Sequence, residues 1–145
     1  MKKPNLKSFL LVVLPLATIL TVATETCQAQ QEEQGDDDTP RLVKAVMAES
    51  IDTLSPVNEA VVFSIDLRRL ICFTEFDPVP VPSLIYHTWY HRGVLIAQKQ
   101  LTIKPPRWSS FSGMQLRDTD IGPWQVDITD DHGRIIETLR FSITE

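Results

Sequence analysis

Strict alternation of apolar and polar residues near the C-terminus is the feature that most constrains the fold of this chain. Over residues 124–129 (WQVDIT) an apolar side chain recurs at every second position, which places Trp124, Val126 and Ile128 on one face of a β-strand. Residues 130–133 (DDHG) then have the composition of a tight turn, and alternation resumes over residues 135–143, where Ile135 begins the apolar face. The pattern predicts a β-hairpin that closes the domain.

A second hairpin is predicted upstream of the first. Residues 84–91 are rich in β-branched and aromatic types, Arg92 and Gly93 supply the turn, and residues 94–103 form the returning strand. Lys99 falls on the apolar side of that strand, so we expect either a bulge or an edge position there.

Four further runs have the composition of strands, at residues 43–48, 61–67, 70–76 and 108–116. Pro78, Pro80 and Pro82 exclude a central strand between residues 76 and 82, because proline cannot donate a hydrogen bond to a sheet. No window after residue 30 shows a sustained helical period. About seven short strands predict an all-β fold, an antiparallel immunoglobulin-like β-sandwich over residues 40–145, with a small closed barrel as the alternative.

The first 29 residues have the layout of a cleavable signal peptide. Three lysines precede an apolar run from residue 9 to residue 23, and small Ala29 marks the expected cleavage site. The run has about 15 residues, fewer than the roughly 20 that cross a bilayer, which disfavours a retained anchor. Acylation at Cys27 is another alternative, which the neighbouring Glu25 disfavours. We therefore expect a periplasmic or secreted protein that meets the membrane only through its signal peptide.

Composition and charge fit one exported globular domain. Of the 145 residues 43% are hydrophobic, and the formal net charge is -5. Five acidic residues fall within residues 30–39, which we interpret as an acidic disordered linker before a nearly neutral domain. The domain has no basic run, which argues against a nucleic-acid partner. Cys72 lies in an apolar run and is expected to be buried as a small hydrophobic residue.

The common catalytic motifs are missing from the sequence. It has no glycine-rich phosphate loop, no His-Glu-x-x-His pair and no Gly-x-Ser-x-Gly elbow. His87 and His91 lie about 13 Å apart along an extended strand, which is too far for them to share a metal. We therefore predict no enzyme activity, no cofactor and no metal. The alternative is a small periplasmic enzyme or metal-handling protein that uses His87, Cys72 and the Asp-rich loops around residues 118–120 and 130–131.

Neighbouring side chains alternate along a strand, so Trp89 and Tyr90 cannot both lie in the core. If Trp89 is buried with Ile85, then Tyr86 and Tyr90 face outward. Aromatic rings combined with hydroxyl and guanidinium groups are typical of carbohydrate-stacking surfaces and protein interfaces. On this ground the predicted binding residues are His87, Trp89, Tyr90, Arg107, Trp108 and Ser110. In the alternative interpretation all three tryptophans are core residues.

Four segments occur in a characteristic order: residues 72–75 (CFTE), 87–93 (HTWYHRG), 107–112 (RWSSFS) and 122–133 (GPWQVDITDDHG). Together they resemble a bacterial family of secreted or membrane-attached proteins filed as domain of unknown function 2914, over most of residues 43–143. The resemblance implies export and brings no activity. Its motif positions include His87, Trp89, Arg107, Trp108 and Ser110. The proline-rich stretch at residues 78–82 departs from the family pattern, which leaves the shape of that loop open.

These features together predict an exported β-sandwich that binds an envelope protein or glycan without performing chemistry. A structural subunit that adds an edge strand to an envelope assembly is an alternative from another class. The sequence makes no prediction about the oligomeric state.

Overall fold

The computed structural model describes residues 38–145, so the predicted signal peptide (1–29) and most of the predicted linker (30–39) lie outside the described residues. The described part of the chain is all-β, as predicted, with two short 3₁₀ helices, η1 (Ile65–Leu67) and η2 (Asp118–Asp120). No helix in this part is long and apolar enough to span a membrane. The strands are β1 (Leu42–Asp52), β2 (Ser55–Glu59), β3 (Val62–Ser64), β4 (Arg69–Phe76), β5 (Ser83–His91), β6 (Val94–Ile103), β7 (Trp108–Gln115), β8 (Gly122–Asp130) and β9 (Ile135–Thr144).

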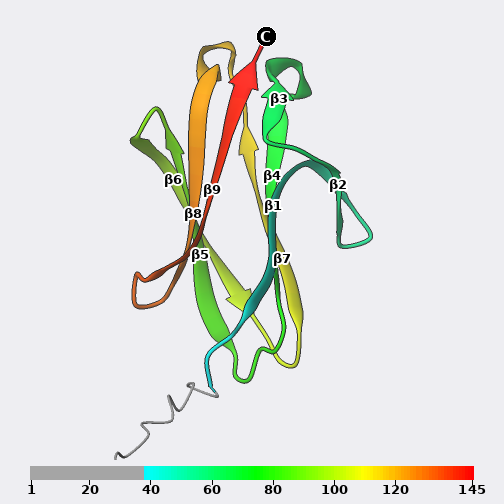
Figure 1. Ribbon diagram of the computed structural model, residues 1–145, viewed down its shortest axis with the longest axis vertical. Coiled ribbons are helices and arrows are strands. Elements are labelled where there is room, and N and C mark those ends of the chain that lie inside the picture. The colour runs from blue at the N-terminus through cyan, green and yellow to red at the C-terminus, as the bar shows by residue number, and fades with distance from the viewer. Residues whose placement is uncertain (1–37) are drawn as a thin grey trace, which may run out of the picture. The chain divides into compact units, whose positions relative to one another are not determined.

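Two sheets form the layers of the fold (Figure 1). One sheet has the strand order β2-β1-β4-β7, and the other has the order β3-β9-β8-β5-β6. The strand pairs are antiparallel, except that β3 runs parallel to β9. The two-sheet, all-β architecture is therefore as predicted, while the parallel pair and strand β2 are additions to it. Strand β3 lies within the predicted run at residues 61–67, the end of which forms η1 instead of a strand.

Strands β2 and β3 are the shortest strands of the fold. The turn before β2 is made by Thr53 and Leu54, both with positive φ angles, of 47° and 60°. Strand β3 has three residues, which pair with Ser142–Thr144 at the end of β9. Three residues are too few to display a period of two, so pairing with the distant strand β9 defines the bounds of β3.

The hydrophobic core lies between the two sheets. Trp124, Val126 and Ile128 are 3%, 0% and 0% exposed, which confirms the inward face predicted from their alternation. Trp89 of β5 is also fully buried. It belongs to one buried cluster with Trp124 and Val126 of its own sheet and with Leu70 of the other sheet. The apolar faces of both sheets are thus removed from water together, which is the main stabilisation of a two-layer fold.

Strand β4 is buried on both of its faces. Every residue from 70 to 74 is at most 4% exposed, so this segment has a nearly continuous apolar composition in place of an alternating one. Cys72 packs in the core, as predicted from its apolar neighbours. Burial raises the pKa of the Cys72 thiol, because the thiolate loses its hydration there.

The hairpin of β5 and β6 is present with its turn at Arg92 and Gly93, as predicted. Strand β6 is the last strand of its sheet, so Lys99 occupies an edge position, one of the two places predicted for it. The bulge of this hairpin lies elsewhere, because the register shifts between Trp89 and Tyr90.

Three connections gather at one end of the sheets, which we call the loop end: residues 77–82 between β4 and β5, 104–107 between β6 and β7, and 131–134 between β8 and β9 (Figure 1). The backbone N–H of Val79 donates to the carbonyl of Pro106 at 2.7 Å, which ties the first two connections together. The proline-rich stretch is therefore an ordered loop outside the sheets, as expected for a segment that cannot join a central strand.

Candidate functional site

Three of the six predicted binding residues lie in one buried hydrogen-bond network between the sheets. His87 has no exposed surface, and its Nδ1 lies 2.8 Å from Ser112 Oγ. Its Nε2 lies 3.2 Å from Thr74 Oγ1. Trp89 Nε1 donates to Ser112 Oγ at 3.2 Å, and Thr74 Oγ1 donates to the Ser110 carbonyl at 3.5 Å. The structure thus brings His87, Trp89 and Ser110 together inside the core, out of reach of solvent.

The partners in this network assign one tautomer to His87. Because the Thr74 hydroxyl donates to the Ser110 carbonyl, its oxygen accepts from His87 Nε2–H, and the unprotonated Nδ1 accepts from the Ser112 hydroxyl. Burial lowers the pKa of His87 to about 4, so the imidazole is neutral at pH 7 and matches this arrangement. We assign these residues to the joining of β5 with β4 and β7 across the core.

The remaining three predicted binding residues lie at two separate surface positions. Tyr90 is half-buried on the outer face of the five-stranded sheet, because Trp89 and Ile85 point inward. Arg107 and Trp108 lie at the loop end, where β6 connects to β7. The six residues therefore do not form one site.

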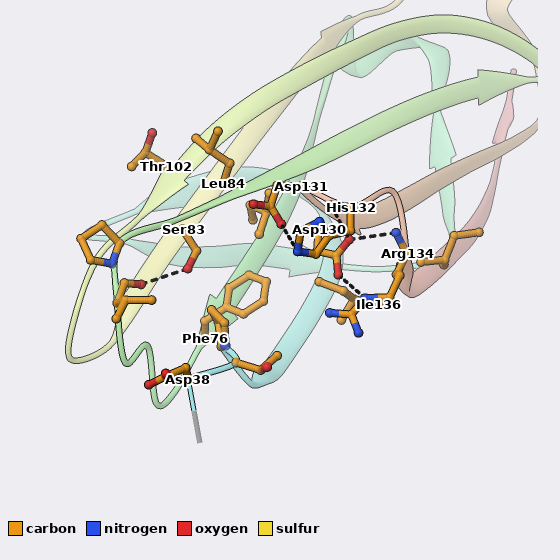
Figure 2. Close-up of a pocket in the computed structure, with 16 residues that line it drawn as sticks. Asp38, Phe76, Ser83, Leu84, Thr102, Asp130, Asp131, His132, Arg134 and Ile136 are labelled. Carbon is orange, nitrogen blue, oxygen red and sulfur yellow. Dashed lines mark hydrogen bonds and ion pairs between the residues drawn. The ribbon is translucent and has the colours of Figure 1, made fainter. Parts of the chain in front are cut away.

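A pocket of about 890 Å³ opens at the loop end. Figure 2 shows residues of β5 and its preceding loop on one side, residues of the β8–β9 turn on the other, and Phe76 between them. Two of the wall residues are strongly exposed, Val81 at 45% and Ile135 at 62%. The apolar residues that line the pocket are Phe76, Val81, Leu84, Ile85, Ile135 and Ile136.

The rim of the pocket is acidic. Asp38, Asp130 and Asp131 contribute three carboxyl groups, against one arginine and one histidine. Asp130 accepts hydrogen bonds from the backbone N–H groups of His132 and Arg134 and from Arg134 Nε at 2.6 Å. Burial raises the pKa of the Asp130 carboxyl, but these hydrogen bonds outweigh it and hold the pKa below its ordinary value. The rim is therefore charged and ordered at neutral pH.

Trp108 supports the floor of this pocket, and Arg107 lies beside it. Trp108 is half-buried and packs against the core cluster that contains Phe76 and Ile85, both of which line the pocket. The Lys104 ammonium lies 5.7 Å from the Trp108 ring centroid. Arg107 forms an ion pair with Glu75 of β4. Of these two predicted binding residues, Trp108 contacts the pocket from below and Arg107 does not line it.

Groups invoked for the enzyme or metal-handling alternative are engaged elsewhere in the described residues. Cys72 and His87 are buried in the core. Asp118, Asp120 and Asp130 each form an ion pair with an arginine. Within the described range, no three or more His, Cys, Asp or Glu side chains are grouped so that they could hold a metal ion. What the loop end offers is an apolar cavity with a charged rim, the usual form of a binding site.

Sequence reasoning missed the pocket walls, and it placed Ile135 on the inward face of β9. The structure corrects this placement, since Ile135 is 62% exposed. The register of β8 with β9 shifts between Ile128 and Thr129, so the start of β9 no longer follows the inner face. A signal was present in the sequence, because Ile135 and Ile136 are adjacent and a strand cannot turn both inward.

The comparison with known families supports the resemblance seen in the sequence. Residues 82–143 match the model of the family described as "Protein of unknown function (DUF2914)". The match spans β5 to β9, while β1 to β4, including Cys72, lie outside it. No curated protein matches the chain. Residues 82–143 are therefore similar to the DUF2914 family.

Proposed function

We propose that this protein is an exported, non-catalytic binding module with an immunoglobulin-like fold, which holds a segment of an envelope protein in its loop-end pocket. The observation that carries the proposal is the pocket of about 890 Å³ with apolar walls and an acidic rim. The signal-like layout of residues 1–29 supports a periplasmic or secreted location.

The strand order supports the immunoglobulin-like assignment. The run β9-β8-β5-β6 corresponds to the order G-F-C-C′, and β1-β4-β7 corresponds to A-B-E. In this scheme Trp89 takes the position of the buried tryptophan of strand C. Cys72 and Val126 then occupy the strands that carry the inter-sheet disulfide in antibody domains, and both belong to the same buried cluster as Trp89. In this protein, packed side chains take the place of that disulfide.

The same scheme supports the loop end as the binding end. In immunoglobulin variable domains the B–C and F–G loops lie at one end and contact the antigen. Their counterparts here are residues 77–82 and 131–134, and residues from both connections line the pocket. This argument is one of fold analogy, and the pocket chemistry adds the specific part.

Pocket chemistry points to a peptide segment with apolar side chains next to a lysine or arginine. Val81 and Ile135 expose apolar surface, and covering this surface with apolar side chains of a partner lowers the free energy. Asp130 is already paired with Arg134, so the other two rim carboxylates, Asp38 and Asp131, are the ones that favour a cationic group over an anionic one. A segment that presents both features complements both parts of the pocket.

Site-specific photo-crosslinking in the native cells tests the proposal. A photoreactive residue replaces Ile135 in the pocket wall, and in a control it replaces Leu54 in the β1–β2 turn. The two positions are matched in exposure, at 62% and 63%. We expect one defined protein adduct from position 135 and none from position 54. The partner identified in this way is then titrated against the purified protein, where Ile135→Ser and Asp131→Asn weaken binding and Leu54→Ser does not.

Two outcomes would contradict the proposal. Equal adducts from both positions would show that the pocket has no preference for the partner. An affinity that is unchanged by both pocket variants, with the variants still folded, would place the interface elsewhere on the molecule.

A further inference from the structure

A second, smaller concavity lies away from the loop end, on the outer side of the five-stranded sheet. Its volume is about 530 Å³, and it is lined by residues from the β5–β6 turn and from β5, β8 and β9. Tyr90, Gln125, Asp127 and Arg140 project into it from three neighbouring strands, and Arg92 from the turn also lines it. We call this concavity the sheet groove.

Arg92 is held over the groove by an unusual local backbone. Its φ angle of 51° is in the left-handed region, which disfavours arginine and favours glycine or asparagine. Its Nη2 donates to the Ile121 carbonyl at 3.0 Å. A Cβ atom on Gly122 would come within 2.8 Å of the same Nη2, so the glycine makes room for the guanidinium. Strain of this kind is retained where other contacts fix the conformation, and it often marks a functional position.

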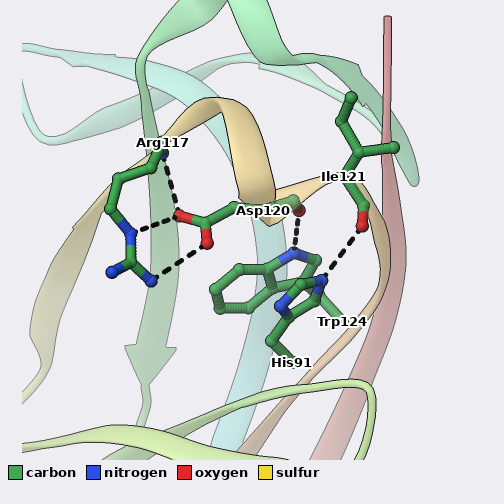
Figure 3. Close-up of polar contacts among 5 residues, drawn as sticks. All are labelled: His91, Arg117, Asp120, Ile121 and Trp124. Atoms are coloured by element: carbon green, nitrogen blue, oxygen red, sulfur yellow. Dashed lines mark hydrogen bonds and ion pairs between the residues drawn. The ribbon is translucent and has the colours of Figure 1, made fainter.

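A set of polar contacts joins the residues next to Arg92, and Figure 3 shows them among His91, Arg117, Asp120, Ile121 and Trp124. The His91 ring stacks on Trp124 at 4.6 Å, and its Nε2 donates to the same Ile121 carbonyl at 3.1 Å. Trp124 Nε1 donates to the Asp120 carbonyl at 2.8 Å. Burial raises the pKa of the Asp120 carboxyl, but hydrogen bonds from Arg117 outweigh it and leave the pKa below its ordinary value. The segment that positions Arg92 is therefore fixed by a connected set of bonds.

The groove carries a net positive charge, because two arginines line it against the single carboxylate of Asp127. In the described part of the chain, neither Arg92 nor Arg140 has a carboxylate within ion-pair distance. Arg140 Nη1 donates to Gln125 Oε1 at 2.8 Å, and Arg92 binds only a backbone carbonyl. Two guanidinium groups on neutral partners keep free N–H donors for an anion.

Hydrogen bonds hold the polar groups beside the arginines in place. Gln125 Nε2 donates to Asp127 Oδ1 at 2.7 Å, and Thr138 Oγ1 donates to the same oxygen at 2.9 Å. Among the described residues no hydrogen bond reaches the second carboxylate oxygen of Asp127. Every buried side-chain polar atom in this part of the chain has a partner, so this oxygen is open to solvent. It offers an acceptor for a hydroxyl group. Half-buried Tyr90 adds an aromatic face and a phenolic hydroxyl.

We propose that the sheet groove binds an acidic saccharide, a pyranose chain that carries carboxylate groups. Arg92 and Arg140 pair with a carboxylate, the ring of Tyr90 covers the apolar C–H face of a sugar, and Asp127 and Gln125 bind its hydroxyl groups. The groove is separate from the loop-end pocket, so this proposal does not depend on the proposed protein partner.

Titration of the purified protein with trigalacturonate tests the site by calorimetry and by amide chemical shifts. The fully methyl-esterified trimer has the same rings without charge, and inorganic phosphate has the charge without rings. We expect trigalacturonate to shift the amides of Tyr90, Gln125 and Arg140, and both control probes to bind at least about tenfold more weakly. Arg140→Gln is expected to reduce the affinity by about tenfold or more.

The matched control variant is Arg69→Gln, which removes the same charge from the outer side of the four-stranded sheet. It is expected to leave the affinity unchanged, as is Ile135→Ser in the loop-end pocket. If Arg140→Gln loses its fold, Arg92→Gln replaces it, because Arg92 is exposed. Equal binding of the esterified trimer or of phosphate would overturn the proposal, and so would unchanged affinity in the folded arginine variants.

Discussion

Buried His87 makes the stability of this protein depend on pH in a range where most carboxylates do not yet titrate. The pKa of His87 is lowered from 6.5 to about 4 by burial, so the unfolded chain binds a proton more readily than the fold does. The stability that depends on neutral His87 is complete above pH 6.5 and is lost as the pH falls towards 4. At pH 5 the unfolded chain is protonated and the fold is not, which lowers the free energy of unfolding by about 2 kcal/mol.

Urea denaturation followed by tryptophan fluorescence at pH 7.5, 6 and 5 measures this loss. His87→Gln removes the titrating group, so the difference between its pH dependence and that of the unmodified protein isolates the contribution of His87. His132→Gln is the matched control, because His132 lies exposed in the β8–β9 turn, and it is expected to keep the full dependence. The reasoning is refuted if His87→Gln and the unmodified protein lose the same free energy between pH 7.5 and 5.

Two further predictions concern the core. Ser112→Ala leaves His87 Nδ1 and Trp89 Nε1 without their shared partner and is expected to lower the free energy of unfolding by about 1–3 kcal/mol, while the surface change Ser109→Ala has little effect. Equal losses in the two variants would contradict the network. Cys72 is expected to resist a thiol reagent in the native protein and to react at once in denaturant, because it is 0% exposed. Rapid labelling under native conditions would show that the core opens more easily than its packing implies.

The two hairpins were predictable because each is a local feature. Alternation over 124–129 places Trp124 inward, and the turn residues Arg92 and Gly93 fix where β5 ends, so neither depends on distant contacts. Strand β2 was not predicted, and of the run predicted at residues 61–67 only the three residues of β3 form a strand, because they alone pair with β9. The same distinction explains the error at Ile135, where a register shift between strands overrides the pattern within one strand.

The predicted binding residues divide along the same line. These residue types are typical of ligand-binding sites, but they also form buried hydrogen-bond networks. Their spacing in the sequence does not distinguish a binding role from a structural one. His87 and Trp89 became core residues because Ser112 and Thr74, from the opposite sheet, supply their hydrogen-bond partners. Gln125, Asp127 and Arg140 escaped notice because the alternation was used to find the inward face, and these are the outward positions of the same strands.

The sequence by itself determined that this chain is an all-β domain with two long hairpins, since side-chain period and turn composition act over a few residues. Which residues line a common cavity was decided only by the tertiary structure. The loop-end pocket joins Val81 to Ile135, and the sheet groove joins Arg92 to Arg140. Each pair is far apart in sequence and comes together because β5, β8 and β9 pair side by side in one sheet.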